Sequence, residues 1–209
     1  MTTFFSERKK CGYCGKETEI MVLTSTNAFG SSDLDLRPPE MERSAMFHEI
    51  EFCEHCGYAA WNLEEKMPAS DELTQILSAK ITVHDTVKVF ERAAKIAQLK
   101  GAEKEKVQFL YLVAAWAADD MNDVATAIAM RKQILASVSA EDEITPSGLL
   151  RLIDIARRGG EKETARELLK RLDNFRLEPL LKRIAAFQEK LLDDNDTACY
   201  TVEDVEKKS

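Results

Sequence analysis

Two short cysteine motifs constrain the fold of this chain more than any other feature of its sequence. Each motif holds two cysteines separated by two residues and followed by glycine: Cys11-Gly-Tyr-Cys14-Gly15 and Cys53-Glu-His-Cys56-Gly57. A CxxCG segment can turn tightly enough for both sulfur atoms to face one ion. The glycine makes this possible because it adopts a positive φ angle, which lets backbone N–H groups point at sulfur.

Four thiolates are the tetrahedral ligand set that Zn²⁺ prefers. The spacing therefore predicts a structural zinc site made by Cys11, Cys14, Cys53 and Cys56. The pattern also fits a rubredoxin-like iron site, because each motif has an aromatic residue in it or beside it. Iron is the less favoured metal, since ribbon proteins with this spacing more often carry zinc. A thioredoxin-type redox pair is favoured less still, because no βαβ pattern surrounds either motif.

The rest of the sequence indicates a cytoplasmic protein. The fifth cysteine, Cys199, stands apart from the motifs, and paired disulfides are not expected in a chain without a secretory signal. The first ten residues carry only Phe4 and Phe5 as large apolar side chains, so no signal peptide is predicted. The longest apolar stretch, residues 109–118, is far shorter than the roughly 20 residues that cross a bilayer.

Composition divides the chain into three segments. Residues 1–67 hold four of the five cysteines and two β-prone runs, 19–24 and 46–52, which a loop rich in Gly, Ser, Asp and Pro at 30–39 connects. Residues 68–192 carry apolar residues at helical spacing, and 193–209 form an acidic tail that we expect to be frayed. The predicted fold class is mainly α with a small N-terminal β zinc ribbon.

The helical segment contains start and stop signals: a capping box at Thr82 and Asp85, an N-cap at Thr145-Pro146, and glycine ends at Gly101 and Gly159-Gly160. Residues 107–118 are apolar on nearly every side, so this helix is expected to be central. Turns recur about every 20 residues, which predicts antiparallel helical hairpins in a tetratricopeptide-like stack or a helical bundle. Arg131 falls where a repeat would need an apolar residue.

Several residues outside the cysteine motifs have both a structural and a functional interpretation. Asp33, Asp35 and Arg37 are either turn and ion-pair residues or part of a binding or catalytic loop. Histidines and tryptophans are expected at the surface or in the core rather than as ligands: His48, His55, His84, Trp61 and Trp116. The sequence contains no phosphate-binding glycine motif and no spacing typical of a catalytic triad.

The order of these motifs resembles the bacterial domain-of-unknown-function family 2225. The resemblance runs from Cys11 to Asp194 and rests on both CxxCG motifs, on the Ser31–Arg37 loop and on the Gly-Tyr-Ala-Ala that ends the second motif. The helices at 92–98, 111–116 and 187–191 add weaker similarity. Glu54-His55 stands where the family commonly has Pro-His, which removes no ligand. The resemblance implies a metal-binding ribbon joined to tetratricopeptide-like helices in a cytoplasmic bacterial protein, and it implies no activity.

Charge separates the remaining function classes. The chain carries 29 basic and 37 acidic residues, which disfavours binding to nucleic acid or anionic membrane. The favoured function is an interaction module whose helical groove binds another protein or a peptide, with a homo-oligomer as a further option. The alternatives are an enzyme that uses Asp33, Asp35 and His48, a nucleic-acid-binding zinc ribbon, and an iron redox protein. A zinc ion with four thiolates has no open position, so no catalytic residue is assigned.

Overall fold

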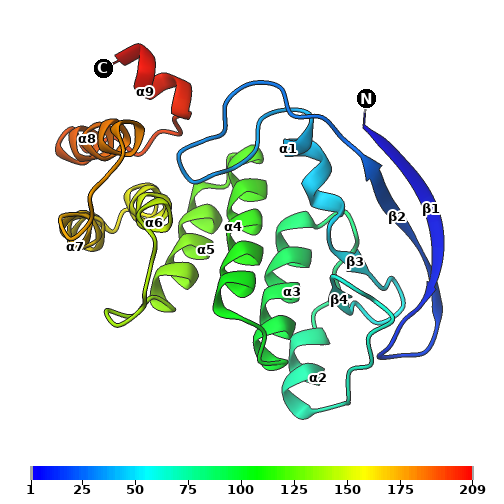
Figure 1. Cartoon of the computed structure of the whole chain (residues 1–209). Helices are drawn as coiled ribbons and strands as arrows, with labels where there is room; N and C mark the ends of the chain where they lie inside the picture. The colour runs from blue at the N-terminus through cyan, green and yellow to red at the C-terminus, as the bar shows by residue number, and fades with distance from the viewer. Residues whose placement is uncertain (1, 209) are drawn as a thin grey trace. The chain divides into compact units, whose positions relative to one another are not determined.

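The computed structural model describes residues 2–208. This part of the chain contains nine α-helices, one 3₁₀ helix and two antiparallel sheets of two strands each, and about half of the residues are helical. Both sheets are formed by the N-terminal part of the chain (Figure 1). The prediction of a mainly α fold with a small N-terminal β element is confirmed. Within the described residues, no helix combines the length and the apolar character that crossing a bilayer requires.

The sheets are two hairpins of unequal length. Strands β1 (Thr3–Lys10) and β2 (Glu17–Ser25) form the long hairpin, while β3 (Glu51–Phe52) and β4 (Ala59–Ala60) form the short one. The predicted strand at 19–24 lies within β2.

The predicted strand at 46–52 is wrong over most of its length. Residues before β3 form α1 (Glu42–Ala45) and the 3₁₀ helix η1 (Met46–His48). The buried side chains here are Ala45, Met46 and Ile50, and their spacing is that of a helical face rather than the alternation of a strand.

The chain contains two compact units. One comprises the chain up to Ala28 together with Met41–Met130, and the other comprises Phe29–Glu40 together with the chain from Arg131 onward. The boundary falls within α5 (Val124–Ala136). This division differs from the segments 1–67, 68–192 and 193–209 that composition indicates, because three whole helices between residues 68 and 130 belong to the unit of the cysteine-rich segment, and the 29–40 loop belongs to the unit of the C-terminal helices.

The first unit contains α2 (Asp71–Leu77), α3 (Thr86–Leu99) and α4 (Lys104–Asp120). Helices α3 and α4 lie side by side as a hairpin, joined through Gly101 at a φ of 71° (Figure 1). Every residue from Leu110 to Ala118 is buried, which confirms the expected central helix. The carboxylate of Asp85 accepts hydrogen bonds from the backbone N–H and the hydroxyl of Thr82. Because α3 begins after Asp85, the predicted capping box is a turn that precedes the helix.

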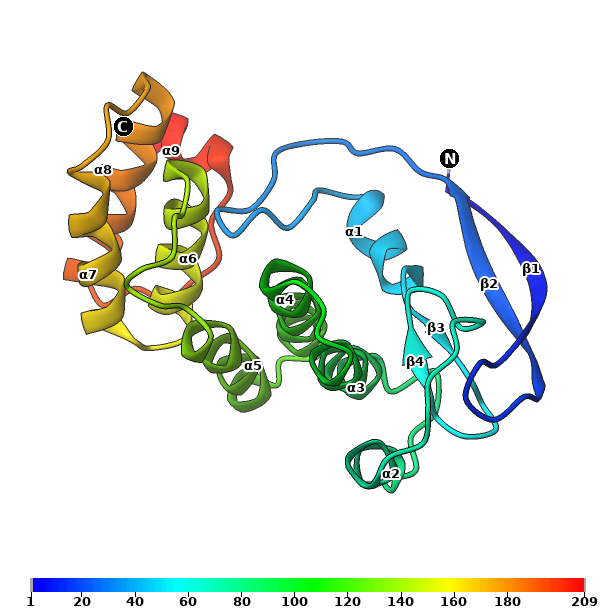
Figure 2. The same ribbon diagram turned by 60° about the horizontal axis from the view of Figure 1, so that its bottom comes forward.

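The second unit contains α6 (Pro146–Arg158), α7 (Lys162–Leu172), α8 (Pro179–Asp193) and α9 (Val202–Lys208). Figure 2 shows α6, α7 and α8 side by side. The Thr145 hydroxyl accepts from the Gly148 N–H at 3.2 Å with Pro146 at the helix start, and Gly160 after α6 has a φ of 75°. The predicted helix start at Thr145-Pro146 and the predicted glycine end of the same helix are both confirmed.

The prediction of a frayed tail is wrong. Val205 of α9 is fully buried, and the segment before α9 forms an antiparallel bridge between Thr201 and Asp33 of the 29–40 loop. The Leu34 N–H donates to the Tyr200 carbonyl, and the Val202 N–H donates to the Ser32 carbonyl, both at 2.9 Å. The tail is ordered because these backbone bonds and the burial of Val205 fix it to its own unit.

Candidate metal centre

Each cysteine motif forms the turn of one hairpin. The first cysteine turn (Cys11–Gly15) closes β1 and β2, and the second cysteine turn (Cys53–Gly57) closes β3 and β4. The two turns make the same backbone hydrogen bonds, from Gly15 to Cys11 at 2.8 Å, from Gly57 to Cys53 at 2.8 Å, from Cys11 to Lys16 at 2.9 Å and from Cys53 to Tyr58 at 2.8 Å. The glycines have φ angles of 74° and 76°, as the CxxCG pattern predicts.

The two turns bring all four motif sulfur atoms together. The Sγ atoms of Cys11 and Cys56 are 3.8 Å apart, those of Cys14 and Cys53 are 3.7 Å apart, and all four lie within 4.8 Å of one another. Sulfur ligands at about 2.3 Å from a tetrahedral ion would be separated by about 3.8 Å. The cysteines are free thiols, and the four of them can hold one metal ion.

The electrostatics of the four thiols also favour a bound cation. Burial raises the pKa of Cys53 and of Cys56. Burial opposes ionisation of Cys14 too, but hydrogen bonds from the Lys16 backbone N–H and the neighbouring thiols outweigh it and lower the pKa of Cys14. Burial thus opposes ionisation of Cys53 and Cys56, and a bound cation would offset this cost.

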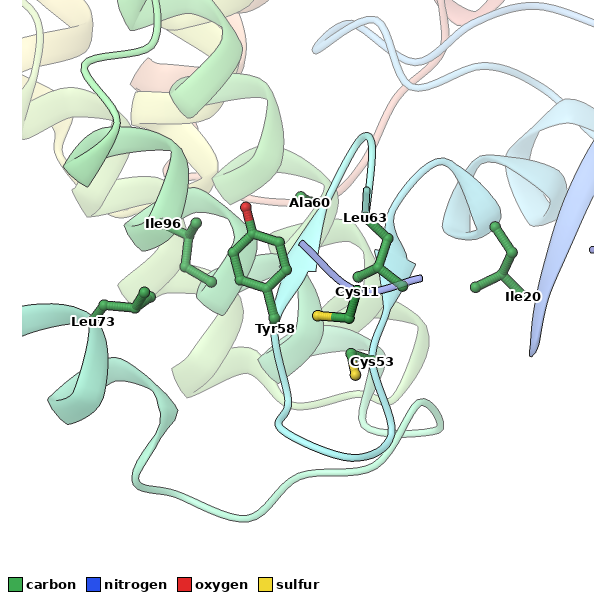
Figure 3. Packing of buried hydrophobic residues seen from close by; sticks show 8 residues of the cluster. All are labelled: Cys11, Ile20, Cys53, Tyr58, Ala60, Leu63, Leu73 and Ile96. Carbon is green, nitrogen blue, oxygen red and sulfur yellow. The ribbon is translucent and has the colours of Figure 1, made fainter. Parts of the chain in front are cut away.

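The site is built into a hydrophobic cluster of the first unit. Figure 3 shows Cys11 and Cys53, which are 1% and 0% exposed, beside Tyr58 and Leu63, with Ile96 of α3 and Leu73 of α2 in the same cluster. The helices α2 and α3 therefore cover the core from which the sulfur atoms project. This packing limits the freedom of the two buried ligands before any ion binds.

Three hydrogen bonds hold the backbone around the first cysteine turn. The Gly12 N–H donates to the Leu63 carbonyl at 2.7 Å, and a Cβ atom on Gly12 would lie 2.2 Å from the Glu65 carbonyl oxygen. The Glu51 carboxylate accepts from Lys9 Nζ at 2.6 Å and from the Leu63 N–H at 2.7 Å. The backbone of residues 63–65 thus approaches the first turn closely, which only a glycine at position 12 allows.

The histidines lie at the surface, as expected, and the metal-binding group found within residues 2–208 contains only cysteines. His55 sits in the second turn, and its Nε2 donates to the Glu17 carbonyl at 2.9 Å, which links the two hairpins. The rings of His48 and Phe4 lie with their centroids 4.5 Å apart at a tilt of 55°, and His84 is exposed.

Arg92 is a site residue that the sequence analysis missed. This arginine of α3 is only 6% exposed, and its Nη1 donates to the Gly57 carbonyl in the second turn at 3.1 Å. Its Nη2 donates to the Ala79 carbonyl at 2.6 Å. The available signal was its position between Phe90 and Ala94, where it interrupts an otherwise apolar face of the helix.

The Asp33 and Asp35 carboxylates lie in the second unit and are buried, at 2% and 0% exposure. Oδ2 of Asp35 is 2.8 Å from Nη1 of Arg158 and 4.0 Å from Nη2 of Arg131, while its Oδ1 accepts from the backbone N–H of Arg37. The structural interpretation of the loop accounts for these contacts. They also explain why an arginine occupies position 131, where a helical repeat would have an apolar residue.

The two tryptophans differ in their exposure to solvent. Trp116 is 2% exposed, as predicted, but the prediction of a core position for Trp61 is wrong, since it is 38% exposed. Ala60 and Leu63 occupy the buried positions around it. Trp61 instead lines a cavity of about 280 Å³ with residues of α3, among them Ala93 and Ala97.

Comparisons of the chain with models of protein families, with curated protein sequences and with solved structures found no match.

Proposed function

We propose that Cys11, Cys14, Cys53 and Cys56 hold one structural Zn²⁺ ion and that the two hairpins form a zinc ribbon. The observation that carries this proposal is the set of four Sγ atoms within 4.8 Å, presented by two turns of the same geometry. Four thiolates complete a tetrahedral shell, so the ion would hold the fold together rather than bind a substrate. The same donor set can bind iron, which is the second candidate.

Elemental analysis of the purified chain tests the metal. We expect close to one zinc per chain, and replacement with Co²⁺ should give the absorption spectrum of a tetrahedral site with four thiolates. One iron per chain would favour the redox alternative. Absence of metal from the chain, with no uptake of Zn²⁺ or Co²⁺ by the reduced protein, would contradict both.

We further propose that the chain acts as an interaction module, with the groove between α7 and α8 as the binding surface for a protein segment. This cavity has a volume of about 550 Å³, and its lining includes the apolar side chains of Leu169, Phe175 and Leu177. The charged residues of the lining are three basic ones, Arg166, Lys170 and Lys182, and two acidic ones, Asp173 and Glu189. A peptide that places apolar side chains beside an acidic residue would match this lining.

A matched pair of variants tests the groove. Ala186→Arg places a long charged side chain on an exposed position of the groove, whereas Ala140→Arg makes the same change on an exposed loop of the same unit. Affinity purification followed by mass spectrometry should recover a partner with the wild type and with Ala140→Arg, but not with Ala186→Arg. Identical recovery with both variants would contradict the groove as the binding surface.

Two alternatives receive less support from the arrangement of their residues. The first is an enzyme that uses Asp33, Asp35 and His48. The two carboxylates are buried, and His48 belongs to the other compact unit. A nucleic-acid-binding ribbon would need a basic surface, but Arg8 and Lys10 of β1 stand opposite Glu19 and Glu17 of β2.

We also propose that the chain belongs with the bacterial family it resembles and works in a reducing compartment, the cytoplasm. The support is the order of its motifs and the five free cysteines, which an oxidising compartment would tend to pair.

A further inference from the structure

Arg92 is a buried cation whose hydrogen bonds, in the described part of the chain, include no carboxylate. Its guanidinium is buried, yet the hydrogen bonds it makes within residues 2–208 go to two backbone carbonyls, those of Gly57 and Ala79, and to no carboxylate. Two other buried arginines face an acid: Nη2 of Arg157 is 2.6 Å from Oδ1 of Asp154, and Nη2 of Arg131 is 4.0 Å from Oδ2 of Asp35. A buried cation is costly unless a nearby negative charge compensates it.

Two groups can place negative charge near Arg92: Cys56 of the cysteine cluster, and the carboxylate of the adjacent Glu91, which is already paired with Lys95 at 2.6 Å. Gly57, whose carbonyl binds Arg92, directly follows Cys56. A divalent ion with four thiolate ligands has a net charge of −2, so the loaded site is an anion within the hydrophobic cluster of the first unit. The Arg92 guanidinium binds the backbone carbonyl one residue after the ligand Cys56.

A second observation links Arg92 to the cysteine turn independently of charge. A Cβ atom on Gly57 would lie 2.2 Å from Nη1 of Arg92, whereas a Cβ atom on the equivalent Gly15 would meet only Lys10 Cε, at 4.0 Å. Both glycines have a positive φ, so the backbone requirement is the same in the two turns. The second turn has the added requirement that Arg92 must approach its backbone closely.

We infer that Arg92 is a positioning residue of the metal centre, which compensates the charge of the metal–thiolate group and ties the second cysteine turn to the α2–α3 junction. The inference rests on the proposed metal binding. Arg92 holds the Gly57 carbonyl with one nitrogen and the Ala79 carbonyl with the other, so loading of the metal is coupled to the order of residues 78–85. Partners of metal ligands that act in this way typically contribute 10- to 100-fold to metal affinity.

The test measures the Zn²⁺ dissociation constant of the full chain by competition with a chromophoric chelator. Arg92→Gln removes the charge, Arg92→Lys keeps it, and Lys95→Gln removes an exposed positive charge from the same helix. We expect affinity to fall by about 10- to 100-fold in Arg92→Gln. We expect Arg92→Lys to recover most of this loss and Lys95→Gln to stay within about twofold of the wild type.

A second pair of variants covers the case in which Arg92→Gln does not fold. Gly57→Ala and Gly15→Ala introduce the same backbone strain, but only Gly57→Ala displaces Arg92, so it should weaken Zn²⁺ binding at least about tenfold more.

Equal affinities for the two glycine variants, or for Arg92→Gln and the wild type, would overturn the inference. An Arg92→Lys variant as weak as Arg92→Gln would overturn the charge assignment. Failure of the wild type to bind Zn²⁺ would overturn the proposed function, and the inference with it.

Discussion

The thiol of Cys199 has a different environment from the four thiols of the metal centre. Its Sγ donates to Oδ2 of Asp33 at 3.3 Å, although the residue as a whole is exposed. Burial, together with the charges of Asp33 and Asp35, raises the pKa of Cys199 to about 12, against the opposing charge of Arg158. At pH 8 the thiolate that reacts with alkylating agents is therefore scarce.

We predict that Cys199 in the folded, zinc-loaded chain reacts with iodoacetamide at pH 8 at least about 100-fold more slowly than in the denatured chain. Peptide mapping by mass spectrometry measures the rate at this one cysteine. Because the folded pKa lies above the unfolded value, the contribution of this thiol to stability is present below pH 9. It is lost as the pH rises from 9 towards 12. Equal rates in the folded and denatured chain would contradict the environment described for Cys199.

Position 12 requires glycine for lack of space rather than for its backbone angle, because a Cβ atom there would overlap the Glu65 carbonyl. We predict that Gly12→Ala destabilises the first unit by about 1–3 kcal/mol and speeds the loss of zinc to a chelator. Gly101→Ala is the control, since it strains a positive φ at a cost of about 1–2 kcal/mol but contacts nothing near the cysteines. Denaturant titration measures the stability of both variants, and chelator kinetics measure how fast each loses zinc. An unchanged rate of zinc loss in Gly12→Ala would contradict the close approach of the Glu65 carbonyl to the first cysteine turn.

Between elements, the 29–40 loop is joined to the helices of its unit by a buried ion pair. Asp35→Asn removes the negative charge that faces Arg158 and Arg131, and we predict a loss of about 3 kcal/mol in the free energy of unfolding. Asp193→Asn is the matched control, because it weakens an exposed pair with Arg166 and should cost less than about 1 kcal/mol. Chemical denaturation gives both values. Similar small losses would show that the loop is not anchored through Asp35.

The elements whose signals are local were predictable from the sequence. The two CxxCG turns, the Thr145-Pro146 helix start and the glycine ends at Gly101 and Gly160 depend on a few neighbouring residues, and the structure contains each of them. The site followed from the same local rule, because each turn fixes two sulfur atoms by itself.

The elements that depend on distant contacts were not predictable. Strand β1 carries mostly exposed side chains, so it shows no apolar alternation. Helix α9 and the segment before it are ordered by contacts with residues 32–34, which lie far away in the sequence. The position of Arg92 on an otherwise apolar face indicates that it is buried, but its partners are two backbone carbonyls, which sequence composition does not reveal.

Across the whole chain, the two compact units should respond differently to loss of the metal. Cys53→Ser removes one ligand from the cluster that also contains Leu73 of α2 and Ile96 of α3. We predict that amide hydrogen exchange then rises in the hairpins and in α2 and α3, while α6, α7 and α8 keep the protection of the wild type. A uniform rise across both units would contradict this division, and unchanged exchange in α2 and α3 would contradict their dependence on the site.

The 29–40 loop has a consequence for how the chain is made. The backbone passes from one unit to the other three times, after residues 28, 40 and 130. During synthesis the loop leaves the ribosome long before Arg158 and the 199–205 segment that it contacts, so its buried aspartates stay in water while the first unit folds. Completion of the second unit then requires the helices to close around a loop that is already attached to folded structure at both ends. A single protease cut within the loop would leave the two units joined through α5.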